Sequence, residues 1–343
     1  MTVPVLAFFN AKGGVGKTSL VYHMAWMYAE LGWKVVAVDL DPQAELTARF
    51  VGEDLIEDLQ EGVSKQRTMS DAIAPLLHGA GELQPVDTLA LTPQLHVIAG
   101  SLELSSYEDT FSSEWMHCLA GKERAFHVTT AFWRVIQRAS AELSADVALV
   151  DLSPFLGALN RAALIASDHI VIPLDADASS LRSLRTVGAV LRQWRDDWSV
   201  RVTKNPAPEL SLPAGTLPPA GYVVLQPVLR MDRPIGTHAR NMARIPSVYA
   251  EAILGRDQAA PSVDDDPNCL GVVRRYGSLM QLSQEARRPI FQLKASDGAI
   301  GAHAKAVLDA RRDFEVLARR IGATSWLRSD GRAGSTEPPA SDR

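Results

Sequence analysis

The sequence predicts an α/β fold with a mostly parallel, twisted sheet and helices on both of its faces. Short runs rich in Val, Ile and Leu alternate with longer segments of helical periodicity, which is typical of βαβ units stacked on a parallel sheet. A glycine-rich segment joins the first apolar run to the first helical segment, and two other apolar runs end in aspartate. Aspartates at strand ends are expected where the carboxyl ends of parallel strands line a ligand site.

Several apolar runs are expected to form strands, with helices between them. The first expected helix covers about residues 18–31 and ends at Gly32, because glycine favours helix C-termini. Another expected helix, over about 180–198, has apolar residues on one face and arginines on the other. The expected strands lie near residues 3–10, 34–39, 95–99, 147–152, 169–174, 221–225 and 270–274.

Length and composition indicate one globular domain. The chain has 343 residues, of which 46% are hydrophobic, and this is enough to fill a core. We expect a single domain over residues 1–328, with a largely helical insert at about 43–145 that begins with an acidic stretch and covers one edge of the sheet. Residues 329–343 are rich in Gly, Ser, Pro and charge, which predicts a disordered tail.

Composition also excludes several classes of protein. No basic region and cleavage site flank the first apolar run, so secretion is not expected, and no apolar run reaches the roughly 18 to 20 residues that a membrane span needs. Cys118 and Cys269 are the only cysteines, so a disulfide framework is not expected and a reducing cytoplasm fits best. The net charge is −5, from 35 basic and 40 acidic residues, which argues against a uniformly basic surface but leaves a local basic face open.

The glycine-rich segment, which reads FNAKGGVGKTS over residues 9–19, has the features of a phosphate-binding loop. Its glycines allow backbone conformations that aim successive N–H groups at phosphate oxygens, and the helix that follows adds the positive end of its dipole. Lys17 is expected to lie along the β- and γ-phosphates, and the Thr18 hydroxyl is expected to bind Mg²⁺. The expected nucleotide-binding residues of this segment are Gly13, Gly14, Val15, Gly16, Lys17, Thr18 and Ser19.

This loop departs from the general P-loop spacing in an informative way. Ala11 stands where a glycine is usual, and a second lysine, Lys12, precedes the glycine pair. Lys-Gly-Gly-x-Gly-Lys-Thr resembles the deviant Walker A loop of the ParA/MinD family of P-loop ATPases, and the chain is most similar to its ParA-like partition members. The resemblance implies that Lys12 acts catalytically, by reaching across a face-to-face dimer to the partner's ATP and offsetting charge on the transferred phosphoryl group.

The resemblance continues at two strand ends. Residues 35–43 read VVAVDLDPQ, which matches the family's Asp-x-Asp-Pro-Gln segment. By that resemblance Asp41 positions or activates the attacking water, and Asp39 supports the magnesium shell or the lysine. Asp151 ends another apolar strand and is the candidate magnesium-facing carboxylate. Thr18, Asp39 and Asp151 are therefore the expected metal-site residues.

The residues that contact adenine are harder to predict. The family places its base-contacting loop after a strand equivalent to the one that ends at residues 226–227. Gln226 and Pro227 are the resulting candidates, although an ordinary exit from a strand into a loop explains them equally well.

The resemblance also implies a function. It implies a cytoplasmic ATP hydrolase that converts ATP and water to ADP and phosphate, slowly and under stimulation by a partner. Its cofactors would be ATP and Mg²⁺, and ATP binding would drive formation of a homodimer. ParA-like members bind non-specific DNA and respond to a ParB-like partner, so we expect a nucleoid-associated role in plasmid or chromosome partitioning.

Local charge leaves the choice of surface open. Residues 270–330 carry eleven basic and six acidic side chains, and together with the arginines of the 180–198 helix they are expected to form a basic face for DNA, although they also fit plain solvation. The alternative is a MinD-like membrane or cargo-positioning ATPase, based on the basic segment at 314–328. A nitrogenase-type reductase lacks suitably placed cysteines, and a bacterial tyrosine kinase would need a tyrosine-rich tail.

Overall fold

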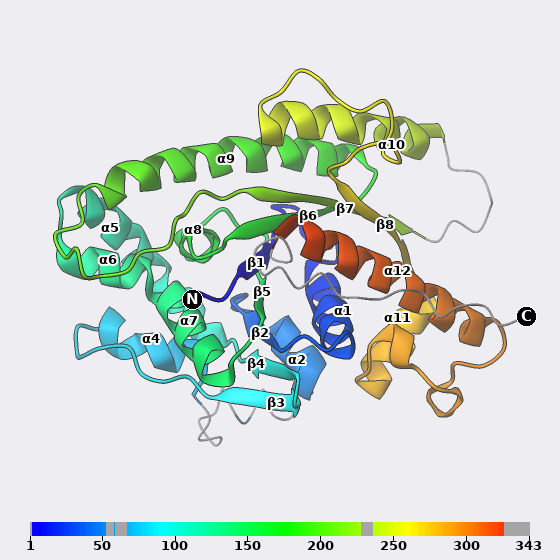
Figure 1. The fold of residues 1–343 in the computed structure, drawn as a ribbon, viewed down its shortest axis with the longest axis horizontal. Coiled ribbons are helices and arrows are strands. Elements are labelled where there is room, and N and C mark those ends of the chain that lie inside the picture. Colours follow the sequence, from blue (N-terminus) through cyan, green and yellow to red (C-terminus); the bar gives the residue numbers. More distant parts are fainter. Residues whose placement is uncertain (1, 53–57, 59–66, 228–235, 326–343) are drawn as a thin grey trace, which may run out of the picture.

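The computed structural model describes residues 2–52, 58, 67–227 and 236–325 (Figure 1). Its described strands form an eight-stranded sheet in the order β3-β4-β2-β5-β1-β6-β7-β8. All neighbouring strands are parallel except β3 and β4. The strands are β1 (Val5–Phe8), β2 (Val35–Asp39), β3 (Thr88–Thr92), β4 (Leu95–Ile98), β5 (Val147–Asp151), β6 (His169–Leu174), β7 (Pro219–Pro227) and β8 (Cys269–Arg275).

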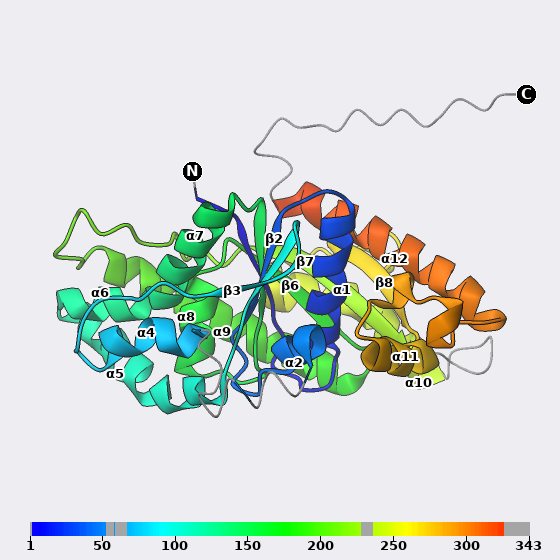
Figure 2. The ribbon, with the colours of Figure 1, turned by 90° about the horizontal axis from the view of Figure 1, so that it is seen from below.

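Helices cover both faces of this sheet, which runs through the middle of the view in Figure 2. One face is covered by α4, α5, α7, α8, α9 and α10, and the other by α1, α2 and α12. The α-helices are α1 (Lys17–Glu30), α2 (Glu45–Val51), α4 (Met69–Leu77), α5 (Glu108–Leu119), α6 (Glu123–Thr129), α7 (Ala131–Leu143), α8 (Ala158–Ile165), α9 (Ala178–Val202), α10 (Gly236–Tyr249), α11 (Gly277–Ala286) and α12 (Ala302–Ser325). Shorter turns are η1 (Leu102–Tyr107), η2 (Ala250–Leu254), η3 (Ile290–Gln292) and η4 (Ala295–Asp297).

The central strands bury both of their faces, which explains their continuous apolar runs. In β1, Val5 and Ala7 belong to the core under α9, whereas Leu6 and Phe8 belong to the core under α1. These four side chains are at most 1% exposed. The mostly parallel sheet with helices on both faces that the sequence predicts is therefore confirmed.

Helix α1 holds the glycine-rich loop against the sheet. It begins directly after Gly16 and is followed by Gly32, and both glycines have a φ of 88°. The Tyr28 hydroxyl donates a hydrogen bond to the carbonyl of Ala318 in α12, at 3.1 Å. Because α1 lies between the sheet and α12, it is buried on most of its surface rather than on one narrow stripe.

The expected strands are all confirmed, and β3 is an additional strand that the sequence analysis missed. Only Leu89 of β3 is buried, so this edge strand lacks the apolar pattern that marks the others. The insert at about 43–145 thus contributes two strands of the sheet as well as helices. The single-domain division stays a prediction, and the expected tail at 329–343 lies outside the described residues.

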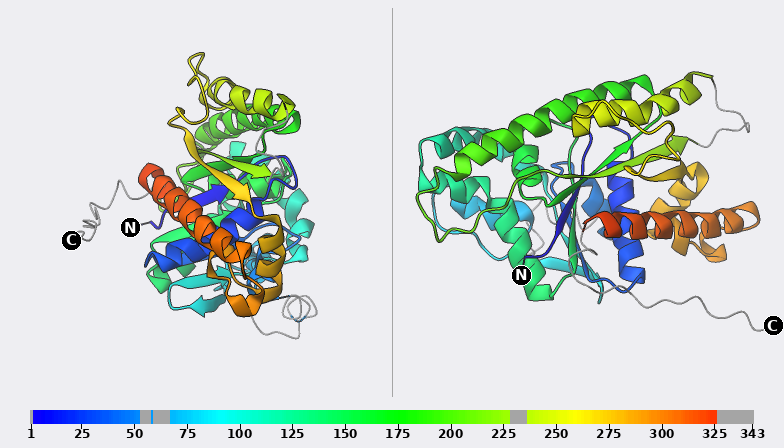
Figure 3. Two further views of the ribbon diagram at one scale, coloured as in Figure 1. Left: turned by 90° about the vertical axis from the view of Figure 1, so that its right-hand side faces the viewer. Right: turned by 45° about the horizontal axis from the view of Figure 1, so that its top comes forward.

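One expectation about surface charge is wrong. The arginine-bearing helix α9 and the basic helix α12 do not form one face, because α9 packs on the opposite side of the sheet from α12 (Figure 3). Helix α12 also buries Phe314, Leu317 and Ile321 in the core, while Leu308 and Val316 of the same helix are exposed. In the described part of the chain, no helix has the length and apolar character needed to cross a bilayer.

Candidate nucleotide site

The sheet order brings the expected site residues together at one edge. Strands β2, β5, β1 and β6 are neighbours in that order, and their carboxyl ends lead into the segments that carry Asp41, Asp151, the glycine loop and Asp175. Asp39 and Phe8 are both in register with Asp151. Residues far apart in the sequence therefore surround one position, as is usual for ligand sites in parallel sheets.

The conformation of the loop depends on two glycines and on Asn10. Gly14 and Gly16 have φ values of 69° and 88°, which favour glycine. Asn10 is fully buried, and its Nδ2 donates to the carbonyl of Pro173 at 2.7 Å while its Oδ1 accepts from the backbone N–H of Lys12 at 3.1 Å. Asn10 therefore fixes the base of the loop to β6, a role that the sequence analysis did not assign.

Lys17 and Asp151 lie on the inner side of this loop. Lys17 is 7% exposed, and burial lowers its pKa, although the charges of Asp151, Asp41 and Glu45 oppose that change. Asp151 is fully buried, and burial together with the charge of Asp39 raises its pKa well above the usual range. Lys17 therefore offsets only part of the negative charge that the nearby carboxylates place at this position.

The Asp151 carboxylate fits a magnesium ligand. The Thr18 hydroxyl lies near enough to favour its charged form, yet neither carboxylate oxygen has a hydrogen-bond partner of ordinary geometry among the described residues. A buried, unpaired carboxylate is expensive unless a ligand completes it. No group of three or more His, Cys, Asp or Glu in the described part is placed to hold a metal.

Asp39 and Asp41 have different environments. Asp39 is fully buried, and its carboxylate accepts from the Thr47 N–H and hydroxyl at 2.8 and 2.7 Å and from the Asp41 N–H at 3.2 Å. Burial raises the pKa of Asp39 to about 7, although the bonds from Thr47 oppose the rise. Asp41 is half-buried and accepts from the Gln43 N–H at 3.0 Å. Asp39 thus holds the turn that presents Asp41 at the site.

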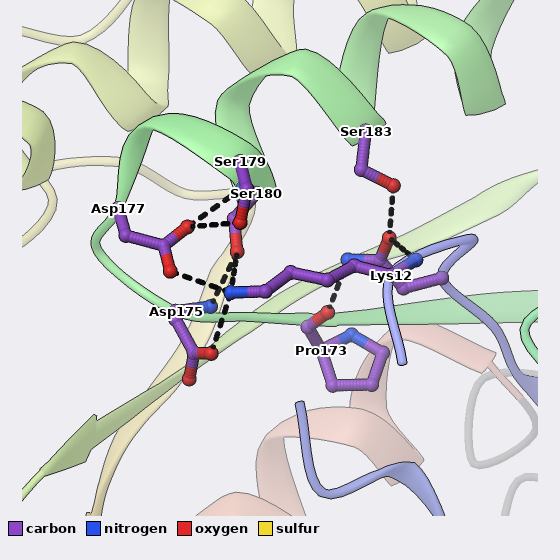
Figure 4. Close-up of polar contacts among 8 residues, drawn as sticks. Lys12, Pro173, Asp175, Asp177, Ser179, Ser180 and Ser183 are labelled. Atoms are coloured by element: carbon purple, nitrogen blue, oxygen red, sulfur yellow. Dashed lines mark hydrogen bonds and ion pairs between the residues drawn. The ribbon is translucent and has the colours of Figure 1, made fainter. Parts of the chain in front are cut away.

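Lys12 reaches from the loop to the residues around the start of α9 (Figure 4). Its Nζ lies 2.9 Å from the Asp175 carboxylate and 2.6 Å from that of Asp177, and it donates to the Ser180 hydroxyl at 3.3 Å. Burial acts to lower the pKa of Lys12, but the hydrogen bonds and charges of both aspartates outweigh it and raise that pKa. Burial is the largest single effect on the pKa of Asp177 and acts to raise it, but the bonds from Lys12, the Ser180 N–H and the Ser179 hydroxyl together outweigh burial and bring that pKa down to about 2.

A small apolar cavity lies beside the loop, at the ends of β7 and β8. Its volume is about 190 Å³, and it opens next to Gly16 and Ser19 of the expected binding segment. Gln226 and Pro227 end β7 immediately after Leu225, which lines the cavity, and the loop expected to contact the base, at 228–235, lies outside the described residues. The other lining residues, which the sequence analysis missed, are Leu20, Val273, Arg274, Tyr276, Gly277, Met280, Ile290 and Phe314.

Known proteins resemble this chain in sequence over its first half. The model of the AAA domain family matches residues 3–202. A putative replication protein A of Sinorhizobium fredii is 32% identical over 56% of this chain and 45% of its own length. The chromosome-partitioning ATPase Soj of Thermus thermophilus is 29% identical over 55% of this chain and 62% of its own length. The chain spans about half the length of the curated relatives it matches.

Solved structures resemble the fold over nearly the whole chain. Protein DIP2308 of Corynebacterium diphtheriae has a TM-score of 0.66 at 21% identity, over 95% of this chain and all of that one. Cyanothece McdA, solved with ATP, has a TM-score of 0.59 at 14% identity, over 94% of this chain and 97% of its own. The family model matches more than half of the chain, so the chain belongs to the AAA domain family, and its relatives in sequence include a partition ATPase.

Proposed function

We propose that this protein is a ParA-like nucleotide switch, in which two protomers bind Mg-ATP between them and hydrolysis ends their association. The observation that carries the proposal is the buried carboxylate of Asp151, which has no hydrogen-bond partner of ordinary geometry among the described residues and lies beside Lys17 and Thr18. Lys17 and Thr18 begin the helix that follows the glycine loop. Such an arrangement offers a carboxylate and a hydroxyl to a divalent cation, and backbone N–H groups and a lysine to a polyphosphate.

The loop and the three nearby aspartates each have a role in this proposal. Lys17 and the backbone N–H groups of residues 13–19 hold the phosphates, while Thr18 and Asp151 hold Mg²⁺, which neutralises phosphate charge when it is bound. Asp41 positions the attacking water, because it is the half-buried carboxylate at the rim of the site. Asp39 acts from behind: its oxygens already accept three hydrogen bonds, so we assign it to supporting Asp41 and the metal shell.

The cavity beside Gly16 is the proposed adenine site. It is lined largely by apolar side chains, among them Leu225, Met280 and Phe314, which suit the faces of a purine. Most residues that line the cavity are far from the loop in sequence. The sheet brings them next to the loop, because β7 ends at the cavity. Gln226 and Pro227 stay candidates for polar and backbone contacts at its rim.

Lys12 is proposed to act in trans on the partner's nucleotide. To do so it must leave Asp175 and Asp177, which hold it in the single protomer (Figure 4). The ion pairs are partly exposed, with 20% of the Lys12 side chain accessible, so separating them requires only a modest free energy. ATP binding and contact with a second protomer would supply it.

The proposed cellular role is the partitioning of DNA in the cytoplasm. The relatives that match this chain in sequence include a chromosome-partitioning ATPase, which supports plasmid or chromosome segregation over the MinD-like alternative. By analogy with such proteins, hydrolysis would be slow and stimulated by a ParB-like partner, and the ATP dimer would bind non-specific DNA on the nucleoid. Exposed Arg240 and Arg244 on α10, next to α9, offer one basic surface for phosphate contacts.

Two assays test this proposal on the purified protein. Hydrolysis of ATP should require Mg²⁺ and stop with EDTA, and an ATPase that ignores EDTA would contradict the assigned site. Binding to arbitrary duplex DNA should require ATP and weaken steeply between about 50 and 200 mM salt, because released counterions drive it. ATP-dependent binding to anionic liposomes without DNA binding would instead favour the MinD-like alternative.

A further inference from the structure

The segment between Asp151 and α8 forms part of the wall of the nucleotide site. It begins directly after β5 and includes Pro154, whose Cγ would lie 3.9 Å from a Cβ placed on Gly13 of the loop. Leu152 and Ser153 are buried, whereas Phe155 is 67% exposed. The position of this short segment therefore decides what faces the phosphates on the side of Asp151.

The segment is tied to α8 rather than to the loop. Asn160 Nδ2 donates to the carbonyls of Ser153 and Phe155, at 2.8 and 2.5 Å. Asn160 Oδ1 accepts from the Ser153 hydroxyl at 3.3 Å. Because Asn160 is the third residue of α8, the segment lies wherever the first turn of α8 is held.

That first turn is held from another helix. Glu108, the first residue of α5, accepts hydrogen bonds from the backbone N–H groups of Ala158 and Leu159, the latter at 3.0 Å. The residue that precedes α8 is Gly157, which has no side chain to cap the helix. A Cβ on Gly157 would lie 2.5 Å from Glu108 Oε1, so the close approach of Glu108 depends on glycine at this position.

Helix α5 is a firm support for this contact. Its Phe111, Trp115 and Cys118 side chains are at most 3% exposed, and Phe111 stacks on Phe132 of α7 with ring centroids 5.0 Å apart. Glu108 itself is half-buried and emerges from the anchored end of the helix. A carboxylate held on a rigid element positions its partners better than one on a loop.

We infer that Glu108 is a positioning residue for ATP hydrolysis: it holds the start of α8, and through Asn160 it keeps residues 152–157 against the phosphate loop. The inference rests on the proposed function, since it assigns Glu108 to the same site. Loss of Glu108 should free the segment without removing any phosphate contact. Hydrolysis should then slow while ATP affinity stays the same, because misplacement affects the chemical step most.

A set of three variants separates positioning from simple helix capping. Glu108→Ala removes the contact, and Asp109→Ala, at the next and exposed residue, is the matched control that also removes an acid from the first turn of α5. Glu108→Ala combined with Gly157→Ser gives α8 a cap of its own, because the space that Glu108 filled is then free. This double variant restores the helix end but not the link to α5.

The readouts are kcat, KM for ATP, Tm, and hydrogen exchange of residues 152–160 without nucleotide. We expect Glu108→Ala to lower kcat about tenfold, leave KM within about twofold, and speed exchange of the segment about tenfold. The double variant should recover the Tm that Glu108→Ala loses, but not the kcat. Asp109→Ala should match the wild type. Recovery of kcat together with Tm, or unchanged exchange in Glu108→Ala, would overturn the inference. A wild-type protein that does not hydrolyse ATP would contradict the proposed function instead, and the exchange data would still judge the role of Glu108.

Discussion

The two lysines of the glycine loop have opposite environments, although only four residues separate them. Lys17 is 7% exposed and lies among carboxylates, one of which, Asp151, has no hydrogen-bond partner of ordinary geometry among the described residues. Lys12 is 20% exposed at its side chain and is fully engaged by Asp175, Asp177 and Ser180. One side of the loop is incomplete without a ligand, whereas the other is complete within one protomer.

This difference teaches how a single loop can both bind and switch. The incomplete side gains most of its stability from the ligand, so nucleotide binding should be favourable in the single protomer. The complete side has to exchange its internal ion pairs for contacts with a partner, so dimer formation should be nearly balanced. Nearly balanced equilibria are the ones that hydrolysis and partner proteins can shift.

The largest effect is expected from removing the ligand-facing lysine. Lys17→Ala should weaken ATP binding by at least about 100-fold, because it removes a buried charge that we propose lies along the phosphates. Binding of a fluorescent ATP analogue measures the change. Lys204→Ala is a suitable control, because Lys204 lies on the surface after α9. Unchanged ATP binding in Lys17→Ala would show that Lys17 does not face the nucleotide.

The second effect should appear in the chemical step alone. Asp41→Ala should bind ATP and form the dimer, yet hydrolyse about 100-fold more slowly, since the loss of water positioning affects the transition state more than the ground state. Single-turnover hydrolysis with radiolabelled ATP separates binding from chemistry. A normal rate would remove Asp41 from the site and would point to another carboxylate at the rim.

The third effect concerns Lys12. Asp177→Asn keeps a side chain that can cap α9 but removes one charge from the pair, so Lys12 should be released more easily. We expect the ATP-dependent dimer to tighten about fivefold, which corresponds to ~1 kcal/mol for partly exposed ion pairs. Analytical ultracentrifugation with Mg-ATP measures it.

The same change in a Lys12→Ala background is the control for this third prediction. Without the lysine, Asp177→Asn has no ion pair to release, so dimer affinity should not change further. If Asp177→Asn tightens the dimer equally in both backgrounds, its effect does not pass through Lys12, and the ion pairs have no part in the switch.

The smallest effect is on the stability of the free protein. Because the pKa of Asp151 is raised in the folded state, the folded chain binds more protons than the unfolded chain, and stability falls as the pH rises. Asp39, whose pKa burial raises to about 7, contributes in the same direction. Asp151→Asn should therefore raise the free energy of unfolding at pH 8 by about 1 kcal/mol, and by less at pH 6.

Urea unfolding at the two pH values measures this stability difference. The reference is the wild type without nucleotide, since Mg-ATP would stabilise it and hide the effect. An Asp151→Asn variant that is less stable than the wild type at pH 8 would show that the carboxylate has an internal partner after all, and the nucleotide side of the loop would no longer count as incomplete.

The sequence predicts the phosphate loop well because its chemistry is local. Gly14 and Gly16 need positive φ values, Lys17 and Thr18 follow at fixed spacing, and all of this is visible within one segment. The strands are also readable, since the central ones are buried on both faces. Edge strand β3 is not, because its residues are mostly partly exposed.

Features that depend on strand order could not be predicted in this way. Lys12 meets Asp175, 163 residues away, only because β6 lies beside β1. The contact of Glu108 with α8 spans 50 residues and depends on the packing of α5. The expected basic face failed for the same reason, since the sequence does not show that α9 and α12 lie on opposite sides of the sheet.

The central claim is that this loop holds ATP that is shared between two protomers, and the most direct test is the molecular mass of the protein in solution. Analytical ultracentrifugation of Asp41→Ala with Mg-ATP should show a dimer with one ATP per chain, while ADP, or the absence of nucleotide, should leave a monomer. Adding Lys17→Ala should abolish the dimer. A protein that stays monomeric and retains no ATP in the presence of magnesium would contradict the account.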